Sequence, residues 1–215
     1  KDLSVLDADG RTMVDSVSFS VRAGEVVGIA GVQGNGQTEL VDALTGLRNS
    51  TRGRVALDGQ DITSASPRVR HAKGIAHIPE DRQRQGLVGG LSIAENLVLT
   101  RYHDEEFSNG IVMDWPVAHS VAENLIAEYD IRTPSADIEA STLSGGNQQK
   151  VIVARELSRP LRLSIAAQPT RGVDVGSIEY IHSRIIKERD TGTAVLIVST
   201  ELDEVMALSD RLLVM

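Results

Sequence analysis

The chain has 215 residues, of which 41% are hydrophobic, so it is long enough for one large domain with a substantial core. Its net charge of −8 argues against nucleic acid as the main partner, because binding to a phosphate backbone depends on a basic surface. It contains no cysteine, which excludes disulfides, thiolate chemistry and cysteine-ligated metals. No apolar run approaches the roughly 18 residues of a membrane span, and no signal peptide is visible. The sequence stops inside an apolar run at residues 212–215, so we expect the chain to be part of a longer polypeptide.

The first part of the chain predicts two short strands, then a buried strand, a glycine loop and a helix. The short strands are expected at residues 2–6 and 15–21, separated by a turn at Asp9-Gly10. The continuous apolar run at residues 26–30 is typical of a buried parallel strand. After the glycine loop, four apolar residues recur at helical spacing: Leu40, Val41, Leu44 and Leu47. This order is the setting in which phosphate-binding loops occur.

The rest of the chain alternates predicted strands with predicted helices. Strands are expected at residues 75–78, 163–166 and 194–199, and helices at 93–99, 115–129 and 147–158. Ser92 and Asp114 are candidate N-caps of the first two helices, and Glu95 stands at the capping-box position. The pattern therefore predicts an α/β sheet with a helical insertion near residues 85–160.

The glycine loop has the composition of a phosphate-binding loop that lacks its lysine. Its glycines allow backbone N–H groups to turn toward phosphate oxygens at a helix N-terminus. Thr38 stands where a hydroxyl would ligate Mg²⁺, but Gln37 replaces the lysine that pairs with the β- and γ-phosphates. A dinucleotide-binding loop is excluded, since Glu39 stands where glycine or alanine is needed. The predicted binding residues are Gly31, Gly34, Asn35, Gly36, Gln37, Thr38 and Glu39. A glycine-rich turn that binds nothing remains the alternative.

A second glycine-rich turn precedes the helix predicted at residues 147–158. It consists of Leu143, Ser144, Gly145, Gly146, Asn147 and Gln148. A helix N-terminus with a serine hydroxyl and two glycines is a second candidate anion site. The alternative is a capped helix start with no ligand.

These two turns and the segment Gln168–Asp174 together resemble the ATP-binding domain of ABC transporters over essentially the whole chain. With Pro79–Arg82 and Gly86–Val88, the likeness narrows to the second of two fused ATPase domains in bacterial importers of simple sugars and nucleosides. The resemblance implies a P-loop NTPase of the ABC ATPase type, with a mixed sheet core, an antiparallel β subdomain and a helical signature subdomain.

The resemblance also implies how the domain is organised and what it works with. Residues 1–215 would form one nucleotide-binding domain, with a RecA-like core and antiparallel part at about 1–84 and 161–215, and a helical subdomain at about 85–160. The cofactors would be ATP and Mg²⁺. The partners would be a second ABC ATPase domain fused N-terminally, transmembrane permease subunits and, indirectly, an external substrate-binding protein. The implied location is the cytoplasmic face of the bacterial inner membrane.

In the family such domains pair head to tail, so that each ATP lies between one domain's P-loop and the other domain's signature turn. This sequence departs from the family at the positions that act on its own ATP. Ala167 and Gln168 stand in place of the Asp-Glu pair, Thr200 in place of a histidine, and Glu80 at the position of a glutamine. Alanine cannot position Mg²⁺, and a glutamine side chain is no base near neutral pH. Phe19 is the sole aromatic residue before the glycine loop, and its alternation predicts a core position rather than a platform for adenine.

The second glycine-rich turn, Leu143–Gln148, corresponds to the signature turn of the family. This turn and Asp174, which serve the partner's site in the family, are intact. We therefore expect a degenerate own site, weak or absent hydrolysis by the isolated domain, and a competent site completed by the signature turn. Two alternatives stay open: an ATPase that is fully active despite the substitutions, and an interaction module that has lost nucleotide. Arg171 is expected either at the dimer seam or as a plain surface arginine, and the five histidines show no metal-ligand spacing.

Overall fold

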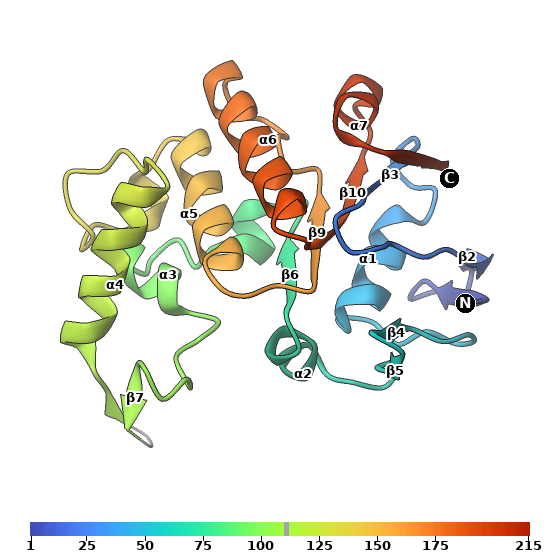
Figure 1. The fold of residues 1–215 in the computed structure, drawn as a ribbon, viewed down its shortest axis with the longest axis horizontal. Coiled ribbons are helices and arrows are strands. Elements are labelled where there is room, and N and C mark those ends of the chain that lie inside the picture. The colour runs from blue at the N-terminus through green and yellow to red at the C-terminus, as the bar shows by residue number, and fades with distance from the viewer. Residues whose placement is uncertain (110–111) are drawn as a thin grey trace. The chain divides into compact units, whose positions relative to one another are not determined.

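The computed structural model describes residues 1–109 and 112–215 (Figure 1). These residues form two compact units. The sheet unit comprises residues 1–77, 159–168 and 184–215, and the helical unit comprises residues 78–158 and 169–183.

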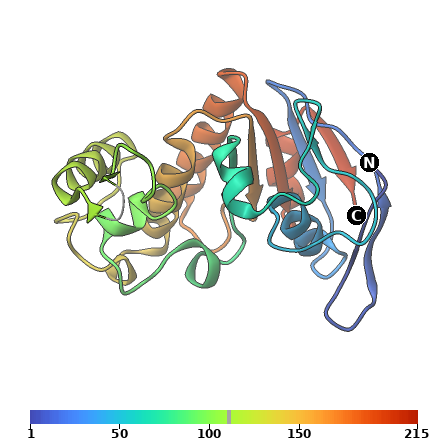
Figure 2. The same cartoon turned by 90° about the horizontal axis from the view of Figure 1, so that it is seen from below.

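The sheet unit is built on a main sheet of five strands. Its elements are β1 (Leu3–Leu6), β2 (Thr12–Val17), β3 (Val26–Ala30), α1 (Gln37–Thr45), β4 (Ala56–Leu57), β5 (Gln60–Asp61), α2 (Pro67–Ala72), β6 (Ile75–Ile78), β9 (Leu163–Ala167), β10 (Ala194–Ser199), α7 (Leu202–Leu208) and β11 (Arg211–Val214), together with the end of α6 (Val175–Asp190). The main sheet has the order β11-β3-β10-β9-β6, and β10 is parallel to both β3 and β9. The antiparallel pairs β1–β2 and β4–β5 form separate sheets, and Figure 2 shows the first of them as the dark blue hairpin.

The two faces of β3 explain the helices that cover it. Val27 and Ile29 share a core cluster with Leu40 of α1, so α1 packs on one face. Gly28, between them, faces the other way, and a Cβ there would lie 2.3 Å from a methyl group of Val205 in α7. The glycine therefore lets α7 approach the strand closely. The predicted buried strand at residues 26–30 is confirmed, with all five residues buried.

The second predicted strand has different bounds. It was expected at residues 15–21 but runs from Thr12 to Val17. The predicted turn explains the difference, because the Asp7 carboxylate accepts hydrogen bonds from the amides of Asp9 and Arg11. This tight turn lets pairing with β1 resume at once, with Thr12 opposite Leu6.

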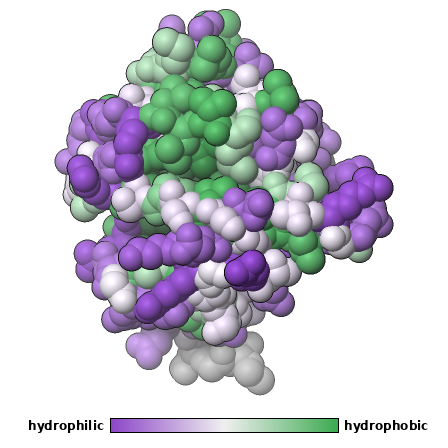
Figure 3. Space-filling view, turned by 90° about the vertical axis from the view of Figure 1, so that its right-hand side faces the viewer, coloured by the Kyte–Doolittle hydropathy of each residue, from purple (hydrophilic) through white to green (hydrophobic). Residues whose placement is uncertain are grey.

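Strand β11 lies at an edge of the main sheet and pairs with β3 on one side. Leu212 and Val214 of this strand are exposed, as are Leu202 and Met206 of α7. Figure 3, which views the side of the molecule that carries these elements, shows apolar surface gathered there. Across the whole described chain, no helix combines the length and apolarity needed to cross a membrane.

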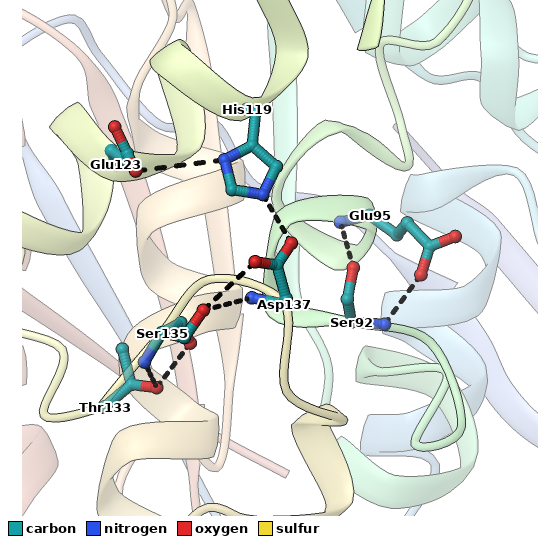
Figure 4. Close-up of polar contacts among 7 residues, drawn as sticks. All are labelled: Ser92, Glu95, His119, Glu123, Thr133, Ser135 and Asp137. Carbon is teal, nitrogen blue, oxygen red and sulfur yellow. Dashed lines mark hydrogen bonds and ion pairs between the residues drawn. The ribbon is translucent and has the colours of Figure 1, made fainter. Parts of the chain in front are cut away.

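The helical unit consists mainly of three packed helices. Its elements are η1 (Arg82–Gly86), α3 (Ile93–Val98), β7 (Ser108–Asn109), β8 (Val112–Met113), α4 (Trp115–Glu128), η2 (Ala140–Thr142), α5 (Gly145–Leu157) and the start of α6. Both predicted N-caps are confirmed: Ser92 and Glu95 form a reciprocal capping box (Figure 4), and the Asp114 carboxylate accepts from the amide of Val117.

The predicted helix at residues 147–158 begins two residues earlier, at Gly145. Ser144 is its N-cap, since the hydroxyl of Ser144 accepts a hydrogen bond from the amide of Asn147 at 3.4 Å. Glycine disfavours helices, which makes a later start the natural expectation from sequence. In the fold, close approach of other segments requires glycine at this turn, as described below.

Candidate functional site

The glycine loop opens α1 at the carboxyl end of β3. Gly36 is the N-cap residue, with a φ of 91°, and a Cβ there would lie 2.1 Å from the carbonyl oxygen of Met13 in β2. Only glycine fits this backbone conformation and this contact. Because Gly36 offers no side-chain oxygen to cap the helix, the N-terminal end of α1 keeps its affinity for an anion.

Gln37, which replaces the lysine, is buried at the same turn. Its side chain is 6% exposed, and its Nε2 atom is buried with no hydrogen-bond partner. A Cβ at Gly31 would lie 2.6 Å from this Nε2, so the amide is directed back along the loop. An unpaired buried donor costs about 1–3 kcal/mol, which an anionic oxygen in the loop would offset. The fold therefore leaves a neutral donor where the family places a cation.

The substituted positions at the ends of β9 and β10 come together. Gln168 follows Ala167 with a φ of 49°, and its Oε1 accepts from the hydroxyls of Ser199 at 3.4 Å and Thr200 at 3.3 Å. Parallel pairing places Ser199 opposite Ala30, the last residue before the glycine loop. Gln37, Gln168 and Thr200 thus lie at the same edge of the sheet, the edge where parallel sheets bind ligands. The groups contributed by these three side chains are uncharged.

The signature turn in the helical unit is held by close packing. A Cβ at Gly146 would lie 2.2 Å from the hydroxyl of Ser177 and 2.6 Å from a carboxylate oxygen of Asp174. The Ser144 hydroxyl accepts from the side-chain amide of Asn147 at 3.0 Å as well as from its backbone. Glycine is therefore required at positions 145 and 146, because a side chain there would lie too close to the segment that follows β9.

Asp174 marks the start of α6. Its carboxylate accepts from the backbone amide of Ser177 at 3.0 Å and from its hydroxyl at 2.8 Å. These hydrogen bonds, above all the one from the hydroxyl, hold the pKa of Asp174 below its ordinary value. The carboxylate is therefore ionised and fixed in the turn that the resemblance assigns to the partner's site.

Glu80, at the glutamine position, forms an ion pair within the chain. Its carboxylate pairs with the guanidinium of Arg171 at 2.5 Å. Arg82, two residues further along, donates to the backbone carbonyls of Arg171 and Gly172. Arg171 was expected either at the dimer seam or as a plain surface arginine. In the structure it forms an ion pair with Glu80 inside the helical unit.

Sequence reasoning missed several buried cations, Lys150 and Arg70 among them. Lys150 is 6% exposed, donates to the backbone oxygen of Asp130 at 2.7 Å and to its carboxylate at 2.6 Å, and lies 4.5 Å from the centre of the Tyr180 ring. Arg70, in the sheet unit, is 2% exposed and donates to four backbone carbonyls. Arg70 stands in no motif, and Lys150 ends the signature segment 143–150. A lysine or arginine at one helical position gives no sequence signal for burial.

Other features of the described residues do not enlarge the site. Within residues 1–109 and 112–215, no group of three or more His, Asp or Glu side chains is arranged to hold a metal ion. A cavity of about 560 Å³ in the sheet unit contains Phe19 in its lining but none of the predicted site residues. Phe19 also packs against the main core cluster, as its alternation predicts.

Comparison with known proteins agrees with the resemblance seen in the sequence. A family model described as ABC transporter matches residues 14–171. The nucleoside import ATP-binding protein NupA of Lactococcus lactis subsp. cremoris is 48% identical over 214 residues, and the guanosine import ATP-binding protein NupO of Bacillus subtilis is 49% identical over 212. The ribose import ATP-binding protein RbsA of Chromobacterium violaceum is 40% identical over 213. These alignments cover 99–100% of this chain but 42% of each relative.

Solved structures agree with the predicted fold class. A dimeric bacterial ABC transporter cassette superimposes with a TM-score of 0.83 over 100% of this chain and 92% of that one, at 22% identity. A nucleotide-free ATP-binding cassette from an ABC transporter gives 0.81 over 100% and 85%, at 23% identity. This likeness shows the fold, a P-loop NTPase of the ABC ATPase type. Taken with the family model that covers most of its length, it means that the chain belongs to the ABC transporter family.

Proposed function

We propose that residues 1–215 are one nucleotide-binding domain of an ABC importer, which couples ATP to the uptake of a simple sugar or nucleoside. Relatives named for nucleoside, guanosine and ribose import support this substrate range. Since the chain spans 42% of their length, a second domain of similar size fits in the remainder. We place this domain second, after an N-terminally fused ATPase domain.

The site on this domain's own glycine loop binds nucleotide weakly and does not hydrolyse it. The residues present fit a phosphate group: the N-terminal end of α1 has no side-chain cap, and the buried Nε2 of Gln37 lacks an acceptor. They do not fit hydrolysis, since the Gln168 carboxamide is no base and the buried Ala167 offers Mg²⁺ no oxygen from its side chain. Bound ATP would supply the phosphates that join the two domains, with Thr38 as the ligand to Mg²⁺.

The lost lysine sets the expected strength of this binding. A charge-assisted hydrogen bond contributes about 1.5–3 kcal/mol, so its replacement by a neutral amide weakens phosphate binding by roughly 10- to 100-fold. The loop then serves to hold nucleotide and close the dimer.

The competent site is the one that the signature turn completes. Ser144, Gly145 and Gly146 keep the hydroxyl and the close-packed backbone of the family, and Asp174 is ionised beside them. The partner domain supplies the P-loop of this site. The single observation that carries the asymmetry is the contrast between this intact turn and the uncharged cluster of Gln37, Gln168 and Thr200.

The remaining partners follow from the same proposal. Transmembrane permease subunits hold the domain at the cytoplasmic face of the bacterial inner membrane, and an external binding protein delivers the substrate. Nucleic acid has no part in it.

The experiment compares variants of the full-length protein, reconstituted with its permease, for ATP hydrolysis and substrate uptake. S144R places a large cation in the signature turn and should abolish turnover, whereas Q37A should leave most of it. S141R, at an exposed serine in the same segment, is the matched control. Unfolding temperatures of all three verify that folding is intact.

Each other outcome favours a named alternative. Equal losses in S144R and Q37A contradict the asymmetry, and turnover that survives removal of the partner's P-loop lysine indicates a fully active site here. If neither variant affects turnover and no Mg·ATP binds tighter than the millimolar range, the domain is an interaction module.

A further inference from the structure

The segment 80–86, the signature turn and the turn after β9 meet at one guanidinium group. Asp81 shapes the first of these, because its carboxylate accepts from the amides of Gln83 and Arg84, each at 3.0 Å. Arg82 follows at the start of η1. Its Nη1 donates to the carbonyl oxygen of Arg171 at 2.7 Å, and its Nη2 to that of Gly172 at 3.2 Å. One side chain thus fixes two successive carbonyls about ninety residues along the chain.

The same guanidinium packs against the first residue of the signature helix. A Cβ at Gly145 would lie 2.9 Å from Nη2 of Arg82, 3.4 Å from its Cζ and 3.3 Å from the carbonyl oxygen of Gly172. Glycine is therefore needed at position 145 for Arg82 and Gly172 to reach this place. The Nε of Arg82 is buried there without a hydrogen-bond partner.

The position of this charge is not one that stabilises a helix. A cation beside a helix N-terminus opposes the helix dipole and destabilises the helix. An anion bound at the same end would reverse that cost, since it would gain from both the cation and the dipole. The placement of Arg82 is thus unfavourable in the domain alone and favourable when an anion faces the signature turn.

A second contact joins the same two segments on the next residue. Gly146 packs against Ser177 and Asp174, whose carboxylate caps α6. The signature turn and the turn at residues 171–174 are therefore held together at Gly145 by Arg82 and at Gly146 by the Asp174 cap. The ion pair between Glu80 and Arg171 fastens the same turn to the segment that carries Arg82.

We propose that Arg82 is a positioning residue of the site completed by the signature turn: it holds residues 171–172 against Gly145, so that Ser144 and Asp174 face the partner domain's nucleotide as one rigid piece. This inference rests on the proposed function. Nothing in the family resemblance assigns this role, which comes from the two carbonyl bonds and the contact with Gly145.

The test uses the full-length protein with its permease and three variants. R82Q removes the charge and the forked donor, R82K keeps the charge but cannot serve both carbonyls, and R84Q is the control. Arg84 lies in the same turn with a side chain that is 88% exposed. R82Q should lower kcat for ATP hydrolysis at least tenfold, R82K should recover less than half of that loss, and R84Q should stay within twofold of the unchanged protein.

Hydrogen exchange separates positioning from a general loss of structure. In R82Q, exchange should rise at the amides of residues 144–147 and 171–175, while the unfolding temperature and exchange elsewhere in the helical unit are unchanged. A wild-type kcat in R82Q, or full recovery in R82K, would overturn the inference. A loss of kcat accompanied by faster hydrogen exchange throughout the helical unit would also overturn it.

S144R is measured alongside to separate this inference from the proposed function. If S144R keeps its turnover, the proposed function fails and Arg82 has no site to position. If S144R is inactive while R82Q is normal, the inference about Arg82 alone fails.

Discussion

Arg70 allows the contribution of one buried cation to the sheet unit to be predicted. Its guanidinium is 2% exposed and donates to Ala65, Ala43, Leu44 and Thr63 through their backbone oxygens, at distances of 2.6–2.9 Å. Ala43 and Leu44 belong to the last turn of α1, where a cation also complements the helix dipole. Arg70 therefore fixes the carboxyl end of the helix whose other end carries the glycine loop.

The perturbation is R70M, which keeps much of the volume and removes every donor. Four carbonyls, that of Ala43 buried and the other three part-buried, then lose their partner, at a cost of about 1 kcal/mol each. Burial lowers the pKa of Arg70, so part of the stabilisation by these bonds offsets the desolvation of the cation. We expect a loss of about 4 kcal/mol in the free energy of unfolding, near the range for breaking a buried charged network. For a domain of this size that corresponds to a fall of about 8–16 °C in unfolding temperature.

Calorimetry of the full-length protein measures this change. R68M is the matched control, since Arg68 lies in the same helix and is exposed. R68M should change the unfolding free energy by less than about 0.5 kcal/mol. If R70M and R68M differ by less than about 1 kcal/mol, the four carbonyl bonds do not stabilise the fold as argued.

Two further predictions concern the helical unit. His119 bonds to Asp137 at 2.5 Å (Figure 4), and this bond raises the pKa of His119 and lowers that of Asp137. Because the pKa of His119 is raised, its contribution to stability is present below the pKa of histidine in the unfolded chain and is lost as the pH rises through the pKa in the folded protein. Because the pKa of Asp137 is lowered, its contribution is present above the pKa of aspartate in the unfolded chain and is lost as the pH falls through the pKa in the folded protein. The pair should therefore contribute most between about pH 4 and pH 6.5, and H119Q should remove that pH dependence in thermal unfolding, whereas unchanged dependence would contradict the pairing. K150M removes the buried ammonium that donates to the backbone oxygen and the carboxylate of Asp130 and lies over the Tyr180 ring. It should lower the free energy of unfolding by about 1–2 kcal/mol in urea titrations, and K150R, which keeps the charge, should cost less. Equal losses in the two variants would contradict a contribution from the charge.

Local signals in the sequence predicted much of the fold. The apolar run at 26–30, the Ser92 capping box and the Asp114 cap depend on residues close in sequence, and all three are confirmed. The bounds of β2 and α5 were wrong for a shared reason. Their starts depend on a turn or a close contact that overrides the preference of the individual residues.

The site divides in the same way. Spacing along the chain identified the glycine loop and the signature turn, and the structure brings Gln168 together with Thr200 as strand order requires. Spacing along the chain could not identify the partners of Glu80 and Arg82, since these depend on how segments distant in sequence meet. The roles assigned to the site residues stay predictions until the variants are measured.

The place of β3 in the sheet has a consequence for synthesis. This strand consists of residues 26–30, but its two neighbours in the sheet, β10 and β11, are formed by residues 194–199 and 211–214. At about 5–20 residues per second, a ribosome needs roughly 10–40 s to produce them, and during that time this apolar segment has no strand to pair with. The helical unit, whose core lies mostly in residues 78–158, can fold in this interval. The nascent chain therefore carries an exposed strand just before its glycine loop, and this strand is the segment where chaperone binding or aggregation should first occur.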